Sequence, residues 1–329
     1  MLLPATYVSA LLALIGAVLC FSLWPSFYKF AEARWRFELF AIDFGIGALL
    51  VAIVAAYTFG TLGPEMSFND RLLISGRSAE IWVFATGAIA AFGILLLLVS
   101  SSLLGMAAAF PISFGTAAIL IGITHLRFLR FEWAISGIVI LCVALIAAGA
   151  ASRSLRSGAR TRSWGKGIGL SLWAGIPFAL VQWMLRHTAD PEFGPGPYAT
   201  AVFFAWGMLF ATPVYDFFFM HIKLVGNPIG YAHYKLGGWR FHLPGIWAGG
   251  LWSLGFILLL AALNASGTAA LPSSLLFGLA LLPVPVSMLL AMIRWGEYRN
   301  SRPWTRILLI LGAICFAGGS VALGLAYID

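Results

Sequence analysis

Long apolar runs separated by short polar stretches dominate this chain, and their lengths predict its fold. A bilayer core about 30 Å thick needs roughly 20 residues of helix, and ten runs reach that length. The predicted spans are 6–27, 39–59, 81–103, 104–123, 131–151, 167–185, 198–220, 244–264, 271–293 and 307–327. Only three serines separate the third and fourth runs, so one long kinked helix is the alternative there.

The loops between the predicted spans differ in charge. Counted from an N-terminus outside the cytoplasm, the inner loops carry three, none, five, three and four basic residues, which is 15 of the 20 Lys and Arg. Cytoplasmic loops are enriched in Lys and Arg. The pattern therefore places both termini on the non-cytoplasmic side of a plasma membrane, most simply a bacterial inner membrane.

Composition agrees with the span pattern and narrows the protein class. Of 329 residues, 61% are hydrophobic and 10% are charged, against about 25% charged in soluble domains. The net charge of +8 is spread between apolar runs, which argues against a nucleic-acid-binding face. We expect an integral membrane protein, monomeric or homodimeric, with the lipid bilayer as its surroundings.

The densest basic stretch divides the spans into two groups of five. We interpret residues 1–152 as an N-terminal repeat, 153–166 as a basic cytoplasmic linker and 167–329 as a C-terminal repeat. An odd number of spans in each half gives the halves opposite orientations, the geometry of an inverted repeat. A weak echo is Ser-Leu-Trp at 22–24 and again at 171–173.

Two acidic residues fall inside the predicted spans. Asp43 lies in the second span and Asp216 in the seventh, which hold equivalent places in the two halves. Ionisable groups at membrane depth are costly and often mark ion pathways. Both are candidate ion-coupling residues, and the alternative is a headgroup-level partner for a loop base such as Arg34 or Arg36.

Aromatic, proline and polar residues within the spans are candidates for contacting a small-molecule substrate. Proline frees backbone carbonyls that must line a cavity or be buried, and mid-span tryptophans offer surfaces for a planar ligand. Packing and interfacial anchoring are the competing interpretations. The candidate substrate-binding residues are Trp24, Pro25, Thr116, Trp173, Gln182, Trp206, Trp252, Asn264 and Ser287.

Other chemistry finds little support in the sequence. Three of the five histidines lie between His221 and His242, but their spacings of 12 and 9 residues match no compact metal-ligand pattern. No phosphate-binding loop is present, and no catalytic groups cluster at one depth. We expect no metal, no cofactor and no enzymatic activity.

Several motifs resemble the ureide permeases of the drug/metabolite transporter superfamily. The N-terminal half carries LWPSFYKFAEARWRF, then Asp43-Phe44, then AYTFGTLGP at 56–64. The C-terminal half carries AGGLWSLG at 248–255, Val286-Ser287 and GEYRNS at 296–301. The resemblance implies a ten-helix fold with a central cavity, a cytoplasmic central loop and proton-coupled uptake of allantoin-like or oxo-pyrimidine compounds.

The chain departs from that family's pattern at three positions. Where the family carries polar amides, this chain has Ile94, Leu180 and Phe256. We therefore expect weak or no binding of allantoin itself and a less polar substrate.

The sequence as a whole predicts a secondary active transporter of a small metabolite, a ureide, nucleobase-like or related compound, coupled to protons or another ion. A sugar or drug carrier of the same superfamily is the first alternative. A membrane sensor or scaffold that transports nothing is the second.

Overall fold

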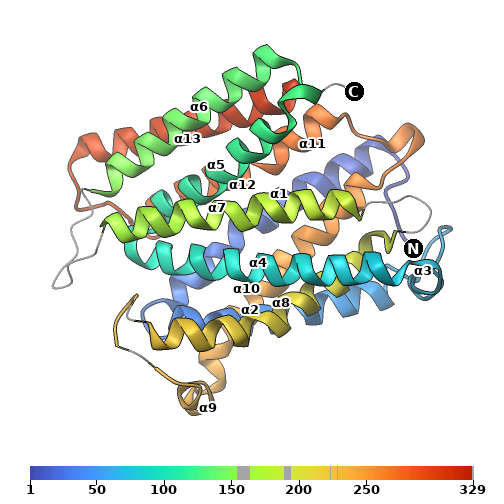
Figure 1. Ribbon diagram of the computed structural model, residues 1–329, viewed down its shortest axis with the longest axis horizontal. Coiled ribbons are helices and arrows are strands. Elements are labelled where there is room, and N and C mark those ends of the chain that lie inside the picture. Colours follow the sequence, from blue (N-terminus) through green and yellow to red (C-terminus); the bar gives the residue numbers. More distant parts are fainter. Residues whose placement is uncertain (154–163, 189–193, 223, 228, 328–329) are drawn as a thin grey trace. The chain divides into compact units, whose positions relative to one another are not determined.

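The computed structural model describes residues 1–153, 164–188, 194–222, 224–227 and 229–327, so most of the predicted linker lies outside the described residues (Figure 1). The described residues form helices throughout and no β-strand. The helices are α1 Tyr7–Ala31, α2 Phe37–Tyr57, α3 Phe68–Ile74, α4 Arg77–Leu104, α5 Met106–His125, η1 Leu126–Phe128, α6 Phe131–Ser152, α7 Trp164–His187, α8 Gly196–His221, α9 Ala232–Leu236, α10 Trp239–Leu263, η2 Gly267–Ala269, α11 Ser273–Ala280, α12 Pro283–Ile293 and α13 Pro303–Ala326.

Ten segments of this described structure are long and apolar enough to cross a membrane. Eight are single helices, one joins α5 to η1, and one joins α11 to α12. The prediction of ten spans is confirmed by length and composition, and the chain has the character of a multi-pass membrane protein.

The boundary between the third and fourth spans lies at a glycine. Ser100 and Ser101 donate their hydroxyls to the carbonyl of Leu97 within α4, so these serines do not end the helix. Gly105 has a φ of +85°, a conformation that glycine adopts without steric cost. Two helices result, and the alternative of one kinked helix is wrong.

The ninth span is broken just before two prolines, Pro283 and Pro285. α11 ends at Ala280, and α12 begins at Pro283 with Leu282 as its N-cap. Proline has no N–H to donate, and its fixed φ suits the first turn of a helix, so Pro283 is well placed to begin α12.

Contacts between residues divide the chain into two compact units, each drawing on both halves of the sequence. Unit 1 is Met1–Phe92 with Leu180–Leu271, and unit 2 is Gly93–Ala179 with Pro272–Asp329. In unit 1, α10 packs against α1 and α2, and α2 packs against α8. In unit 2, α13 packs against α6 and α11, and α5 packs against α6 and α12 (Figure 1).

Glycines bring α2 and α10 into backbone contact within unit 1. A Cβ atom placed on Gly47 would lie 2.0 Å from the carbonyl oxygen of Ile246, and one on Gly249 would lie 1.8 Å from that of Phe44. Helices associate closely in membranes where small residues line their interface. No larger residue fits at this crossing without separating the helices.

A second crossing in unit 1 joins α4 and α8 in the same way. A Cβ on Gly207 would lie 1.9 Å from the carbonyl oxygen of Phe84, and one on Gly87 would lie 1.9 Å from that of Phe204. Each helix again contributes one glycine and one carbonyl three residues before it.

Unit 2 contains a reciprocal contact between α6 and α13. A Cβ on Gly137 would lie 3.1 Å from the carbonyl oxygen of Gly319, and a Cβ on Gly319 would lie 3.1 Å from that of Gly137. Leu141 lies against Gly319 and Leu323 lies against Gly137, so each helix presents the same Gly-x-x-x-Leu surface to the other.

Candidate functional site

The carboxylate of Asp43 is fully buried in unit 1 and is held by side chains from three other segments. Its Oδ2 accepts a hydrogen bond of 2.8 Å from the indole Nε1 of Trp35, in the α1–α2 connection. Its Oδ1 accepts one of 2.6 Å from the hydroxyl of Tyr234 on α9. His242 Nδ1, near the start of α10, lies 2.9 Å from the same Oδ1. We call these four residues the Asp43 cluster.

Small residues allow the cluster to assemble. A Cβ on Gly245 would lie 2.4 Å from the Cβ of Asp43, so the first turns of α10 approach α2 only because residue 245 has no side chain. A Cβ on Gly237 would lie 2.3 Å from the ring of Trp35. The ring of Phe241 stacks on that of Trp35, with ring centroids 5.8 Å apart.

The cluster can change its charge and can reach water. The side chain of His242 is 19% exposed, and its contact with Asp43 becomes an ion pair when the imidazole is protonated. Burial and the bond to Asp43 raise the pKa of Tyr234, so its hydroxyl remains a donor at neutral pH. A buried carboxylate with an imidazole within hydrogen-bond distance is an arrangement that can accept and release a proton.

The bases expected beside Asp43 lie elsewhere. Arg36 forms an ion pair with Glu38 and also donates to the carbonyl oxygen of Asn227. Arg34 is exposed, and the hydrogen-bonding partners of Asp43 among the described residues are Trp35, Tyr234 and His242. The expectation of only two acids within the spans is also wrong, because α2 begins at Phe37 and so includes the fully buried Glu38.

Asp216 on α8 has the opposite environment. It is fully buried, and neither of its carboxylate oxygens has a hydrogen-bond partner among the described residues. Glu38 is close enough for the two charges to interact. Burial and the charge of Asp216 raise the pKa of Tyr231, whose hydroxyl donates to the carbonyl oxygen of Pro213.

Aromatic rings continue from Asp43 along α2 and α10 inside unit 1. Trp24, a candidate substrate residue, contacts Phe44 with ring centroids 5.2 Å apart. Trp252, another candidate, stacks on Phe204 at 5.6 Å and on Phe256 at 5.3 Å. Phe256 is one of the positions where the resembled family carries an amide, and here its ring is packed against two others.

Four further candidates belong to unit 1. Pro25 is buried inside α1 next to Trp24. Gln182 is partly exposed on α7, and Trp206 is exposed on α8. Asn264 ends α10, where its amide donates to the carbonyl oxygen of Leu260 at 2.8 Å. Asn264 thus acts as a local cap in this structure.

Three candidates and one of the altered positions belong to unit 2. Thr116 donates its hydroxyl to the carbonyl oxygen of Ile112 and lies under Gly175. Trp173 is 63% exposed, and Ser287 is buried in α12. The boundary between the units falls within α4 and within α7. Ile94 lies in the part of α4 that belongs to unit 2 and is buried, whereas Leu180 lies in the part of α7 that belongs to unit 1 and is exposed.

Two residues of the Asp43 cluster, Tyr234 and His242, come from the segment from His221 to His242, where no site residue was predicted from the sequence. Among the described residues, no three His, Cys, Asp or Glu side chains are grouped so that they could hold a metal. Tyr234 instead donates to Asp43, 191 residues earlier, and His242 Nδ1 lies within hydrogen-bond distance of the same acid, 199 residues earlier. The sequence signal that could have found them is the gathering of His and Tyr in one predicted cytoplasmic loop.

Comparison with known proteins gives information about the fold and none about the function. No family model matches this chain, and no curated protein does. A solved structure described as "Crystal structure of protein" matches with a TM-score of 0.53 and 17% sequence identity, over 98% of this chain and 99% of its own. The chain thus shares its fold, over nearly its full length, with a protein of known structure.

Proposed function

We propose that this protein is a secondary active transporter of a small metabolite and that the Asp43 cluster couples transport to protons. The observation that carries the proposal is a fully buried carboxylate on a membrane span, bonded to Trp35, Tyr234 and His242. A carboxylate at membrane depth is costly, and such groups often belong to ion pathways.

The contacts suggest how a proton would alter the structure. An ionised Asp43 attracts donors from the α1–α2 connection, α9 and α10, and bonds to a charged acceptor are about twice as strong as neutral ones. A proton on Asp43 removes that charge and weakens all three bonds together. α9 and the start of α10 are then less firmly held to α2, which gives protonation a means of changing conformation.

We further propose that the two halves are inverted repeats, supported by the matched glycine contacts. Adding 160 to positions 44 and 47 of α2 gives 204 and 207 of α8, and adding 162 to positions 84 and 87 of α4 gives 246 and 249 of α10. The two crossings of unit 1 are therefore related by exchanging the second span with the seventh and the third with the eighth. The reciprocal contact of α6 with α13 relates the fifth span to the tenth.

The aromatic rings favour a planar, weakly polar substrate. Trp252 is partly exposed and already stacks on two phenylalanine rings. Flat heterocycles such as nucleobases stack well on such surfaces. This agrees with the ureide permease resemblance in substrate class and with the loss of an amide at Phe256.

The test is proton movement that depends on a solute. Purified protein is placed in liposomes that enclose a pH-sensitive dye, the outside is made more acidic, and ureides, nucleobases and sugars are added one class at a time. We expect one class, with nucleobase-like compounds first, to acidify the interior. Asp43→Asn should abolish this flux, whereas Glu65→Gln, the same change at an exposed acid, should leave it intact.

Thermal unfolding of the same samples separates the alternatives. A compound that binds the folded protein raises its melting temperature. If a compound stabilises the protein but moves no protons, coupling to protons is excluded, and if no transport of it occurs at all, a sensor is favoured. If Asp43→Asn retains wild-type proton flux, Asp43 has a structural role.

A further inference from the structure

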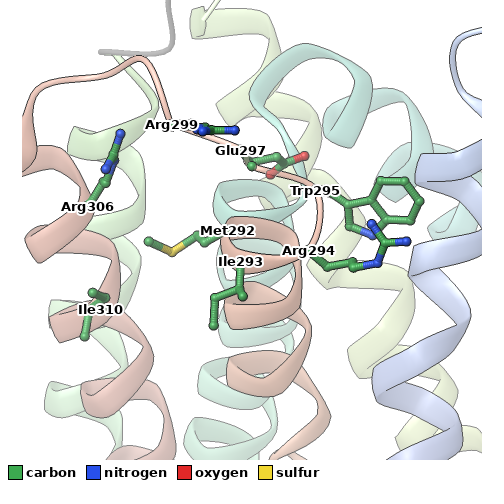
Figure 2. A pocket seen from close by; sticks show the side chains of 9 residues that line it. Met292, Ile293, Arg294, Trp295, Glu297, Arg299, Arg306 and Ile310 are labelled. Atoms are coloured by element: carbon green, nitrogen blue, oxygen red, sulfur yellow. The ribbon is translucent and has the colours of Figure 1, made fainter.

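The connection between α12 and α13 in unit 2 contains a cavity that the transport proposal does not use. Its volume is about 480 Å³, and its wall includes the end of α12, the connection itself and the start of α13 (Figure 2). Three arginines line it, Arg294, Arg299 and Arg306. Two properties distinguish a binding site from an ordinary surface hollow: the charges that line it, and whether the backbone that carries them is held in place.

The connection is fixed to the start of α5 by two neighbouring residues. The carboxylate of Glu297 accepts hydrogen bonds from the backbone amides of Met106 at 3.1 Å and Ala107 at 2.9 Å. The hydroxyl of Tyr298 donates to the carbonyl oxygen of Leu104 at 2.8 Å. Helix N-termini favour negative charge, so Glu297 is engaged there. The backbone that carries the arginines is therefore held in place.

Among the described residues none of the three arginines forms an ion pair, and the acid that shares their cavity wall, Glu297, directs its carboxylate to the amides of α5. The guanidinium of Arg294 lies over the ring of Trp295, 5.4 Å from its centroid. Arg306 Nε donates to the carbonyl oxygen of Tyr298 at 3.1 Å. Most of their N–H donors remain for a ligand, and guanidinium groups suit phosphate.

The cavity is polar at one end and apolar at the other. Figure 2 shows Arg299 and Arg306 toward the connection, with Met292, Ile293 and Ile310 farther along the helices. Ile293 is 79% exposed, although it belongs to a membrane span. A free phosphate compound would satisfy the arginines and leave this apolar end uncovered.

We propose that this cavity binds an anionic phospholipid, with its phosphate on Arg299 and Arg306 and its acyl chain along Ile293 and Ile310. The shape matches a lipid because the charged group and the apolar surface follow each other along the direction of the span. Basic clusters at the ends of membrane helices attract anionic headgroups. The site is distinct from the Asp43 cluster, which belongs to unit 1.

The experiment measures lipid retention by the full chain. Native mass spectrometry of the protein in detergent, titrated with phosphatidylglycerol or phosphatidylcholine, gives an affinity for each lipid. We expect phosphatidylglycerol to be preferred and Arg299→Gln/Arg306→Gln to weaken it about 25-fold, about fivefold for each arginine. Arg302→Gln is the matched control, since Arg302 is exposed in the same connection but does not line the cavity.

Three results would overturn the proposal. The double variant could bind phosphatidylglycerol as tightly as wild type, or Arg302→Gln could lose as much affinity, which would indicate diffuse charge attraction. Inorganic phosphate at millimolar concentration could displace the lipid, which would indicate a site for a soluble anion. Melting temperatures in phosphatidylcholine verify folding, and if the double variant fails to fold, Arg299→Gln alone should show the fivefold loss.

Discussion

Replacing Tyr234 with phenylalanine tests the Asp43 cluster at a single hydroxyl group. The change removes the 2.6 Å bond to Asp43 but keeps the ring, which contacts that of His242 with centroids 4.6 Å apart. Hydrogen bonds to charged groups contribute about 1.5–3 kcal/mol. Because Tyr234 is partly exposed, water can replace part of the bond, and we expect a loss near the lower end, about 1.5 kcal/mol.

A double-mutant cycle shows whether this loss depends on the charge of Asp43. In an Asp43→Asn background the acceptor is neutral, and such bonds contribute about 0.5–1.5 kcal/mol. Tyr234→Phe should then cost only about 0.5 kcal/mol, which leaves a coupling energy of about 1 kcal/mol. The assay is unfolding in mixed micelles of increasing denaturing detergent, followed by circular dichroism.

Tyr231→Phe is the control for this cycle. It makes the same change three residues away, where the hydroxyl donates to the backbone of Pro213 and not to Asp43. Its cost should therefore be equal in both backgrounds. The reasoning is refuted if Tyr234→Phe also costs the same in both, because the hydroxyl would then not respond to the charge at position 43.

The Tyr234→Phe variant also tests how the stability of the protein depends on alkaline pH. Burial and Asp43 raise the pKa of Tyr234 in the folded state above its unfolded value of about 10. Above pH 10 the unfolded tyrosine loses its proton and the folded one keeps it, so the folded state loses up to about 1.4 kcal/mol per pH unit. Wild type should lose stability between pH 10 and 11 faster than Tyr234→Phe. Parallel curves would contradict the shift.

Two further predictions concern the scaffold. Glu297→Gln removes the carboxylate that accepts from the first amides of α5, and we expect it to cost about 1–2 kcal/mol in thermal unfolding. The control is Glu132→Gln, at an exposed acid in the first turn of α6, which should cost less than about 0.5 kcal/mol. Equal losses in the two variants would reject the capping role of Glu297. Gly207→Ala places a methyl group 1.9 Å from a carbonyl oxygen of α4 and should lower the free energy of unfolding by about 3 kcal/mol. Gly318→Ala, where the added methyl group meets open space, should leave stability unchanged or raise it slightly. Unchanged stability of Gly207→Ala would show that α4 and α8 are not tightly packed at this crossing.

The spans were predictable because the bilayer imposes a length and a composition on each of them. Helix ends were less so: α4 begins at Arg77, before the predicted residue 81, because a helix can continue past the apolar run with a polar turn. The break after the third span depends on Gly105 and its positive φ. The prediction placed it at the adjacent serines, but the hydroxyls of Ser100 and Ser101 donate to a carbonyl oxygen within α4.

Asp43 was predictable as a candidate, but its partners were not. An acid inside an apolar run is conspicuous in any sequence. Tyr234 and His242 lie 191 and 199 residues away, and their relation to Asp43 depends on α2 and α10 meeting at glycines. Arg36 is much nearer to Asp43 in the sequence and was the natural candidate partner, but it forms its ion pair with Glu38.

Asp43 and Asp216 look equivalent in the sequence, and the helix contacts show why they are not. The register that relates the two crossings of unit 1 places position 43 opposite Phe203 and position 216 opposite Ala56, neither of which can titrate. Asp216 instead lies near Glu38 at the start of α2, whereas Asp43 lies against Gly245 near the start of α10. The repeated contacts of the backbone therefore carry an unsymmetrical set of charges, concentrated at one end of unit 1. In the transport mechanism proposed above, this arrangement favours one coupling site over two equivalent sites, because Asp43 is the acid that contacts side chains of three other segments.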